Sequence, residues 1–184
     1  MLIAEDLLLL LTDDDTGRLV ASGATVDIAL GGALLVELAL AHRVEVEEAG
    51  GGNRHGRLVV RDGSVLGDDV LDEALATVTR KHGKKTQSVV TALAKGTRAR
   101  LYGRLVAAGL LRAENGHVLG VIPARRWPSQ DAGHETGVHG ELVAALRSGA
   151  ATDARTGALI ALLSALRVVP TVVDPLEWGS PRGS

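Results

Sequence analysis

The sequence predicts a mainly α-helical, single globular domain with a buried central helix and one or two small β-hairpins. Its 184 residues are enough for one domain with a sizeable core. Apolar residues make up 46% of the chain, yet there is no Phe, one Tyr and two Trp, so the core must consist of Leu, Val and Ala. Leu and Ala favour helices. We expect the helical domain to span residues 1–169 and a Pro/Gly-rich tail to span residues 170–184.

The first part of the chain is expected to contain two buried helices and a hairpin. Residues 4–11 predict a short helix that is apolar almost all round, and the aspartates that follow end it in a turn. Thr25 is the expected N-cap of a helix over residues 26–42. Apolar residues cover every side of that helix, which is typical of the central helix of a core. Two short strands, 43–46 and 56–61, are expected to form the hairpin.

The rest of the domain is expected to contain five more helices and a second hairpin. Asp68-Asp69 begins the first of these helices and Gly83 ends it. Asn115-Gly116 between apolar runs predicts the turn of a hairpin over residues 111–122. The other four helices are expected over residues 87–95, 97–108, 141–147 and 153–167, the first, second and fourth with Thr86, Thr97 and Thr152 as N-caps.

Several common signals and sites are excluded by their spacing. No apolar run reaches the roughly 18 residues of a membrane-spanning helix, and the N-terminus carries Glu5 and Asp6 where a signal peptide is basic. The adjacent acids 13–15 lack the alternation of a calcium-binding loop, and His134 and His139 are one residue too far apart for a helical zinc motif. The chain has no Cys. We therefore expect a non-enzymatic protein with no metal and no cofactor.

Charge is distributed unevenly along the chain. Residues 1–79 hold 5 Lys/Arg and 15 Asp/Glu, residues 80–126 hold 11 and 1, and residues 127–184 hold 4 and 6. The basic middle third either presents a face to phosphates or packs against the acidic first third, which would neutralise it. Lys95 and Arg98 flank a predicted helix N-terminus, where free N–H groups and the helix dipole favour an anion. The alternative is that both pair with acids of the first third.

The order of elements in the basic segment also matches a winged helix. In that interpretation Arg98, Arg100 and Arg104 would contact nucleic acid, and Arg125-Arg126 would form the base of the wing. In the anion-pocket interpretation only Arg98 lies at the pocket rim, and Arg100 and Arg104 are ordinary solvated charges on the other face of the helix.

Five segments resemble, in the same order, the Golgi phosphoprotein 3 family. They are MLIAEDLLLLLTDDDTGRL from residue 1, LGGALLVELAL from residue 30, VLDEAL from residue 70, RLVAAGLL from residue 104 and RTGALIALLSAL from residue 155. The resemblance implies a mainly helical domain with a hairpin that faces a membrane. Members of the family bind phosphatidylinositol 4-phosphate, and the eukaryotic members act as adaptors that retain glycosyltransferases in the Golgi. Four Lys against sixteen Arg, with abundant Ala and Gly, indicate a bacterial relative.

The resemblance also implies site residues. The two pocket arginines of the family fall on Lys95 and Arg98, which are both basic. The family's lipid-contacting Trp falls on Ser22 and a further Arg falls on Gly31, so half of the headgroup site is missing. The family hairpin is kept over residues 111–122. The residues expected to face the membrane are Val118, Leu119, Val121, Ile122 and Trp127, with Arg125 and Arg126 beside the Trp as further headgroup contacts.

These observations lead to a functional expectation. The protein is expected to be cytoplasmic and to associate reversibly with membranes through anionic, phosphoinositide-like headgroups, and an adaptor role is compatible with this. Its expected partners are these lipid headgroups, a membrane-associated protein and, as a homo-oligomer, further copies of itself. Nucleic acid is a partner only under the winged-helix alternative.

Overall fold

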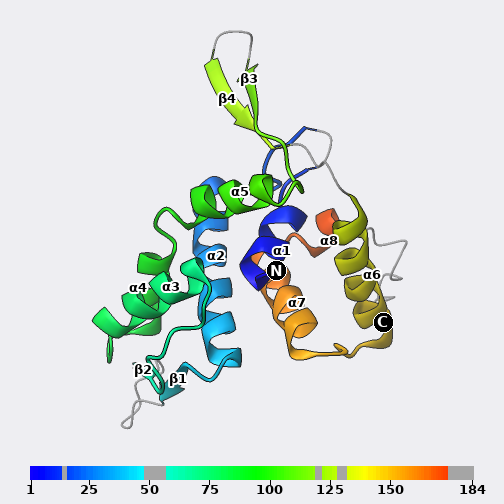
Figure 1. Cartoon of the computed structure of the whole chain (residues 1–184). Coiled ribbons are helices and arrows are strands. Elements are labelled where there is room, and N and C mark those ends of the chain that lie inside the picture. The colour runs from blue at the N-terminus through cyan, green and yellow to red at the C-terminus, as the bar shows by residue number, and fades with distance from the viewer. Residues whose placement is uncertain (14–15, 48–56, 119–121, 128–131, 174–184) are drawn as a thin grey trace.

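Twelve secondary-structure elements make up the described part of the chain. The structure, a computed structural model, describes residues 1–13, 16–47, 57–118, 122–127 and 132–173 (Figure 1). The helices are α1 (Ile3–Leu10), α2 (Gly23–Leu40), α3 (Asp69–Arg80), α4 (Thr86–Leu93), α5 (Thr97–Ala107), α6 (Ala132–Ser148), α7 (Ala154–Leu166) and α8 (Val169–Val172). The strands are β1 (Val44–Glu47), β2 (Arg57–Val60), β3 (Glu114–Val118) and β4 (Ile122–Arg126). The predicted fold class is confirmed.

The central helix is α2. It contacts α1, α3, α4, α5 and α7, and its buried residues join those of α1 in the main core (Figure 1). By length and composition α2 is the one helix in the described ranges that would be able to cross a membrane, so the expectation that no segment is long enough does not hold on that measure. Its position among five other helices is that of the core helix of a folded domain.

Helix α1 is buried over its whole length. All eight of its residues are buried, including the two acids Glu5 and Asp6. Its leucines pack against α2, α5, α6 and α7, which come from distant parts of the chain. The first helix is therefore a core element on which four other helices pack, as its apolar sequence predicts.

All four predicted Thr N-caps differ from the observed ones, and Gly96 takes the place of Thr97 at α5. Ser22, and not Thr25, caps α2: its Oγ accepts a hydrogen bond of 3.2 Å from the Thr25 N–H. Asp153, and not Thr152, caps α7 in the same way through the Thr156 N–H at 2.9 Å. Ser22 lies three residues before Thr25 and Asp153 lies one residue after Thr152, and both have the extended backbone that a cap requires. Thr86 is the first residue of α4 and not its cap.

Helix α6 is longer than the sequence predicted. It begins at Ala132, nine residues before the expected start at residue 141, and therefore includes His134 and His139. Three glycines, Gly133, Gly137 and Gly140, lower the intrinsic helix propensity of this stretch. Packing of α6 against α1 and α7 offsets that cost.

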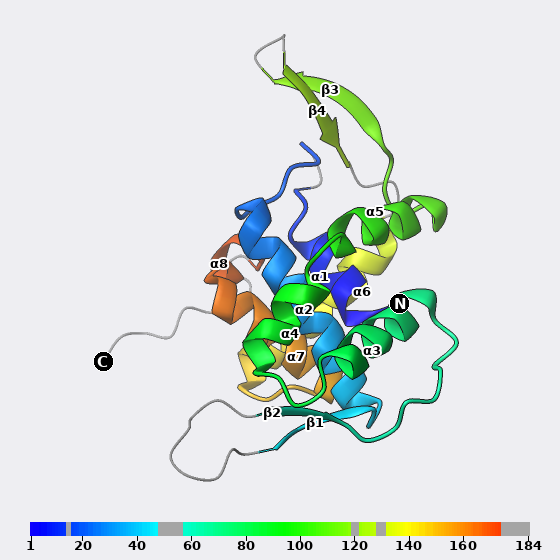
Figure 2. The ribbon, with the colours of Figure 1, turned by 90° about the vertical axis from the view of Figure 1, so that its left-hand side faces the viewer.

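Both predicted hairpins are present. β1 and β2 pair antiparallel, with Val44 opposite Val60. β3 and β4 also pair antiparallel, but Asn115 and Gly116 lie inside β3, opposite Arg125 and Ala124, so they do not form the turn. The β3–β4 hairpin extends away from the helices, and the β1–β2 hairpin lies at the opposite end of the molecule (Figures 1 and 2).

Candidate functional site

The N-terminus of α5 is formed by a sharp turn after α4. Gly96 precedes the helix with φ of 75°, a conformation that residues with a side chain rarely adopt. The hydroxyl of Thr97 donates a hydrogen bond to the carbonyl oxygen of Leu93, so it is not available to cap α5 as predicted. The first N–H groups of α5 have no side-chain cap, and Arg98 lies directly in this first turn.

The guanidinium of Arg98 reaches across to the first turn of α2. Its Nε lies 3.1 Å from Oδ1 of Asp27, and a Cβ placed on Gly23 would lie 2.7 Å from its Nη1. Helix α2 has no acid in its first turn. The positive end of the α2 dipole and the Arg98 guanidinium therefore lie together, with only Asp27 to balance them locally.

A surface pocket opens beside this arrangement. Its volume is about 480 Å³, and its lining includes Arg18, Gly23, Arg98, Tyr102 and Trp127. The pocket has two arginine side chains, one helix N-terminus and one aromatic wall. Such a pocket favours a small anion that is attached to a less polar group.

The aromatic wall is a stacked pair. The rings of Tyr102 and Trp127 have centroids 4.4 Å apart and are 7° from parallel. Burial raises the pKa of Tyr102, whose hydroxyl shares a hydrogen bond of 3.1 Å with the hydroxyl of Thr12. The backbone N–H of Trp127 donates a hydrogen bond of 3.1 Å to the carbonyl oxygen of Gly17. Trp127 therefore lies half-buried at the root of the β3–β4 hairpin, in the wall of the pocket.

Lys95 does not lie in the Arg98 pocket. It lines a separate pocket of about 240 Å³, together with Glu73 and Arg100, on the side of α5 that faces α3. Arg100 forms an ion pair with Glu73 there. The two residues onto which the resemblance places the family's pocket arginines thus lie on different sides of the α5 N-terminus.

The remaining predicted site residues lie on the β3–β4 hairpin. The register places Arg126 opposite Glu114 and Arg125 opposite Asn115, next to Trp127 at the root of the hairpin. The register pairs Val118 with Ile122 at the far end of the two strands. Leu119 and Val121 lie outside the described residues.

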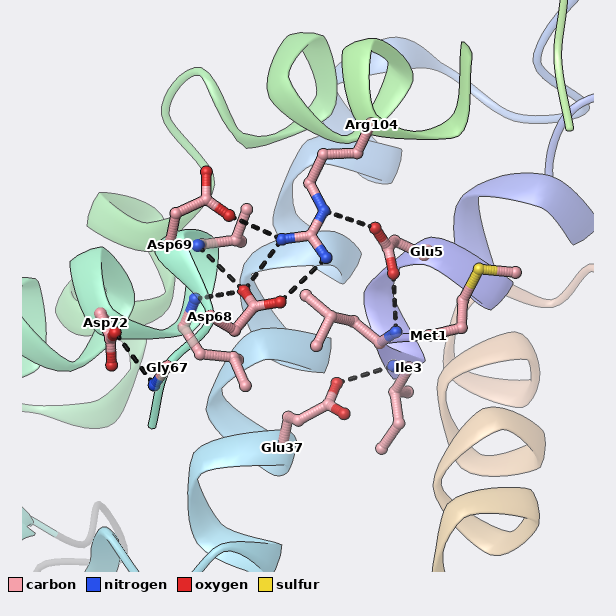
Figure 3. Close-up of polar contacts among 12 residues, drawn as sticks. Met1, Ile3, Glu5, Glu37, Gly67, Asp68, Asp69, Asp72 and Arg104 are labelled. Carbon is pink, nitrogen blue, oxygen red and sulfur yellow. Dashed lines mark hydrogen bonds and ion pairs between the residues drawn. The ribbon is translucent and has the colours of Figure 1, made fainter. Parts of the chain in front are cut away.

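Acids of the first third neutralise the arginines of α5. Arg98 pairs with Asp27, Arg100 pairs with Glu73, and Arg104 lies in a network that links three helices. The partners of Arg104 are Glu5 at 2.7 Å, Asp68 at 2.9 Å and Asp69 at 2.7 Å (Figure 3). For the arginines of α5 the structure bears out the alternative in which the basic middle third packs against the acidic first third. The interpretation as an ordinary solvated charge is wrong for Arg104, whereas Arg100 is exposed and pairs with the exposed Glu73.

The Arg104 network changes the pKa values of its members. Partial burial alone would raise the pKa of Asp68, but hydrogen bonds from Arg104 and from the N–H of Leu71 lower it below its ordinary value. The hydrogen bond with Asp68 is the main cause of the raised pKa of Arg104. Asp68 also caps α3 through the N–H groups of Val70 and Leu71, so one carboxylate joins the helix cap to the ion-pair network.

A second buried acid cluster lies on the other side of α1. Asp6 accepts hydrogen bonds from Arg155 Nε at 3.1 Å and lies 2.9 Å from Nε2 of His134. Glu37 accepts a hydrogen bond of 2.6 Å from the N–H of Ile3 and lies 3.5 Å from Nη1 of Arg155. Burial raises the pKa of Glu37. The described residues contain no group of three or more His, Cys, Asp or Glu that would hold a metal ion.

The backbone of α4 leaves little room for a side chain at Gly31. A Cβ placed there would lie 2.6 Å from the carbonyl oxygen of Val90 and 2.9 Å from the N of Ala94. Helix α4 therefore passes so close to α2 that the arginine of the resembling family has no room at this position. Ser22, at the position of the family's Trp, is the N-cap of α2.

Several pocket residues were missed at the level of sequence. Arg18, Gly23 and Asp27 lie more than 70 residues before Arg98 and only folding brings them to it, whereas Tyr102 lies four residues after Arg98 on α5. The one available signal was Asp27, which with Glu37 is one of two acids in the mainly apolar α2.

Comparison with known protein families gives a match over nearly the whole chain. Residues 3–182 match the model of a family described as Golgi phosphoprotein 3 (GPP34). No curated protein matches the sequence.

Proposed function

Because the chain belongs to the Golgi phosphoprotein 3 family, we propose that it is a peripheral membrane protein that binds an anionic phospholipid headgroup in the Arg98 pocket. Membership of the family suggests a lipid-binding or adaptor role. The finer assignment is a headgroup of the phosphoinositide type, bound reversibly from the cytoplasmic side. The protein acts by binding and has no catalytic step in this proposal.

The convergence of Arg98 with the N-terminus of α2 carries the proposal. A phosphate in the pocket would accept hydrogen bonds from the guanidinium and lie at the positive end of the α2 dipole. Arg18, which also lines the pocket, adds a second positive charge. The ring of Trp127 offers an apolar surface to the ring or glycerol part of a headgroup.

The position of the pocket also supports a membrane surface. The pocket lies at the root of the β3–β4 hairpin, because Trp127 follows β4 directly and also lines the pocket. The hairpin extends outward from that end of the molecule (Figures 1 and 2). Val118 and Ile122 are the apolar residues at the far end of its strands. A hairpin that enters the headgroup layer would hold the pocket at headgroup depth.

The winged-helix alternative has weaker support. The order α4, α5, β3, β4 is present. However, two of the three arginines that would contact nucleic acid, Arg100 and Arg104, form ion pairs with acids of α3 and α1. A phosphate backbone would have to displace these acids, and the carboxylates would repel it.

Cosedimentation with vesicles tests the proposal. Arg98→Ala is expected to reduce binding to vesicles that contain phosphatidylinositol 4-phosphate at least tenfold, because it removes the central positive charge of the pocket. Lys95→Ala is expected to have a smaller effect, since Lys95 lines another pocket. Arg147→Ala, an exposed cation at the end of α6, is the matched control for loss of charge.

The fluorescence of Trp127 supplies a second readout. The chain has two Trp residues, so a Trp178→Phe variant leaves Trp127 as the only one. Titration with the soluble headgroup inositol 1,4-bisphosphate should change its emission, because the ring lines the pocket. Absence of vesicle binding at low salt, or tighter binding of duplex DNA at matched salt, would refute the proposed function.

A further inference from the structure

We propose that the molecule has a second anion-recognising surface, at the end opposite to the β3–β4 hairpin, and that its partner is an acidic segment of another protein. The surface consists of five basic residues, named here the lysine patch: Arg57, Arg80, Lys81, Lys84 and Lys85. Its assignment to a soluble partner rests on the proposed function, because a molecule docked by the β3–β4 hairpin turns this end away from the membrane.

The first observation is a contrast in charge neutralisation. Each arginine of α5 has an acid within ion-pair distance, whereas in the described part of the chain no ion pair joins a residue of the lysine patch to an acid. Four of the five residues are exposed, and Lys81 is half-buried. The positive charge of the middle third is therefore available to a partner mainly at this patch, and not along α5.

The second observation is that the backbone holds the patch in place. The N–H of Gly83 donates to the carbonyl oxygen of Leu58 at 2.9 Å, and the N–H of Leu58 donates to the carbonyl oxygen of Lys84 at 3.3 Å. Lys85 forms a bridge with Arg57. The α3–α4 connection thus pairs with β2. This pairing holds the positive charges close together before a partner binds, which lowers the entropic cost of binding.

The third observation is the use of lysine. Three of the four Lys of the chain lie within residues 81–85, although the chain has sixteen Arg. Lysine is a compact, strongly hydrated charge on a flexible stem, whereas arginine binds carboxylate and phosphate alike through a rigid bidentate fork. The described aromatic residues Tyr102 and Trp127 lie in the wall of the Arg98 pocket and offer the patch no platform on which a base would stack. Flexible single charges without an aromatic platform suit the mobile carboxylates of an acidic protein segment.

The location separates this surface from the lipid site. The patch is attached to β2, and the β1–β2 hairpin lies at the end of the molecule opposite to the β3–β4 hairpin in both views (Figures 1 and 2). Lipid and acidic segment would therefore bind at the same time. The protein would link a membrane to a soluble partner.

The test measures binding of a labelled peptide of ten Glu and Asp residues to the full chain at physiological salt. It is carried out with the protein in solution and with the protein bound to vesicles. The variant Lys81→Gln, Lys84→Gln, Lys85→Gln is expected to weaken peptide binding at least tenfold and to leave vesicle binding unchanged. The control Arg112→Gln, Arg147→Gln, Arg167→Gln removes the same charge from exposed positions elsewhere and is expected to change peptide binding less than threefold. Thermal melts establish that both variants are folded.

The outcomes distinguish this inference from the proposed function. Peptide binding that is absent in the wild type, or equal in the two triple variants, would overturn the inference. Duplex DNA bound more tightly than the peptide would assign the patch to nucleic acid instead. Vesicle binding lost in the lysine variant but kept in Arg98→Ala would show that the patch faces the membrane, which refutes both assignments. Vesicle binding lost in Arg98→Ala alone leaves the proposed function intact whatever the peptide does.

Discussion

Arg98 and Arg104 lie on the same helix but serve different purposes. Arg98 lines an open pocket and pairs with one acid, whereas Arg104, which is about as exposed as Arg98, pairs with three acids of α1 and of the start of α3. An arginine with one partially exposed acid can exchange that partner for a ligand. An arginine that pairs with a buried carboxylate cannot exchange it for a ligand without leaving the buried charge unpaired.

Asp27 should limit the affinity of the pocket. Its carboxylate lies 3.1 Å from Nε of Arg98, and both side chains are 32% exposed. An anionic headgroup must replace this carboxylate and is repelled by it, so Asp27→Asn is expected to strengthen binding to anionic vesicles about fivefold, which corresponds to about 1 kcal/mol. Glu47→Gln, an exposed acid on β1, is the matched control. Weaker binding in Asp27→Asn would show that Asp27 positions Arg98 for the ligand and does not compete with it.

Arg104 should be important for stability. Arg104→Ala leaves the buried carboxylate of Glu5 unpaired, and we expect a loss of about 2–3 kcal/mol, somewhat below the value for a fully buried pair because Arg104 is 31% exposed. Arg100→Ala, on the same helix with the exposed partner Glu73, should cost less than about 1 kcal/mol. Urea unfolding of both variants measures the difference. Equal losses would mean that the Arg104 network does not contribute more than a surface pair.

At the scale of the elements, the close contact between α2 and α4 depends on Gly31. Gly31→Ala is expected to destabilise the protein by about 1–3 kcal/mol, because the new Cβ meets the backbone of α4 at 2.6 Å and a helix cannot move aside locally. Gly32→Ala is the matched control: its Cβ would lie 3.6 Å from Leu162 Cδ2, so the higher helix propensity of Ala should stabilise the protein by up to about 1 kcal/mol. Thermal unfolding of the two variants gives the comparison, and a stabilising Gly31→Ala would contradict this account.

Local sequence patterns predicted the elements better than their ends. The apolar residues of α1, α2 and α7 are dense enough for the helices to be recognised from the chain alone. The N-caps were placed wrongly because Ser and Asp compete with nearby Thr for the same role, and backbone geometry decides between them. Most of α6 was missed because its glycines hide a helix that depends on packing against α1 and α7.

The candidate site was predicted only in part for a different reason. Arg98 was identified from its place at a helix start, but its partner Asp27 is 71 residues away and Trp127 reaches the pocket through a contact with Gly17. Charge counts left open whether the acidic and basic parts of the chain would meet, and they did not indicate which arginine would stay accessible. Lys95 and Arg98 are three residues apart on a helix start, yet they enter different pockets because Gly96 turns the chain between the two helices.

For the molecule as a whole, two carboxyl groups should give opposite pH effects on stability. The pKa of Asp68 is lowered in the folded state, so its stabilising contribution is present above the ordinary value near 3.8 and is lost as the pH falls through the folded value. The pKa of Glu37 is raised, so the folded protein loses stability as the pH rises from the ordinary value of 4.5 through the higher folded value.

Urea unfolding at a series of pH values separates these two effects. Asp68→Asn keeps a residue that caps α3 well, and it should flatten the loss of stability below pH 4. Glu37→Gln can still accept the hydrogen bond from the N–H of Ile3, and it should remove the loss of stability above pH 4.5. A profile for either variant that is parallel to the wild type over its window would show that the group titrates alike in the folded and unfolded chain.

The two adjacent acids of α1 have a consequence for how the protein is made. Glu5 finds Arg104 after 99 further residues, and Asp6 finds Arg155 only after 149. During synthesis α2 follows α1 directly, but α6 and α7 emerge much later, so the part of α1 that these two helices cover stays exposed until they are added. The high sequence separation of these contacts also predicts a slow final step of folding. The ribosome therefore releases a chain whose first helix is among the last to be enclosed, and its yield in a cell should depend on chaperones that hold this segment until α7 is complete.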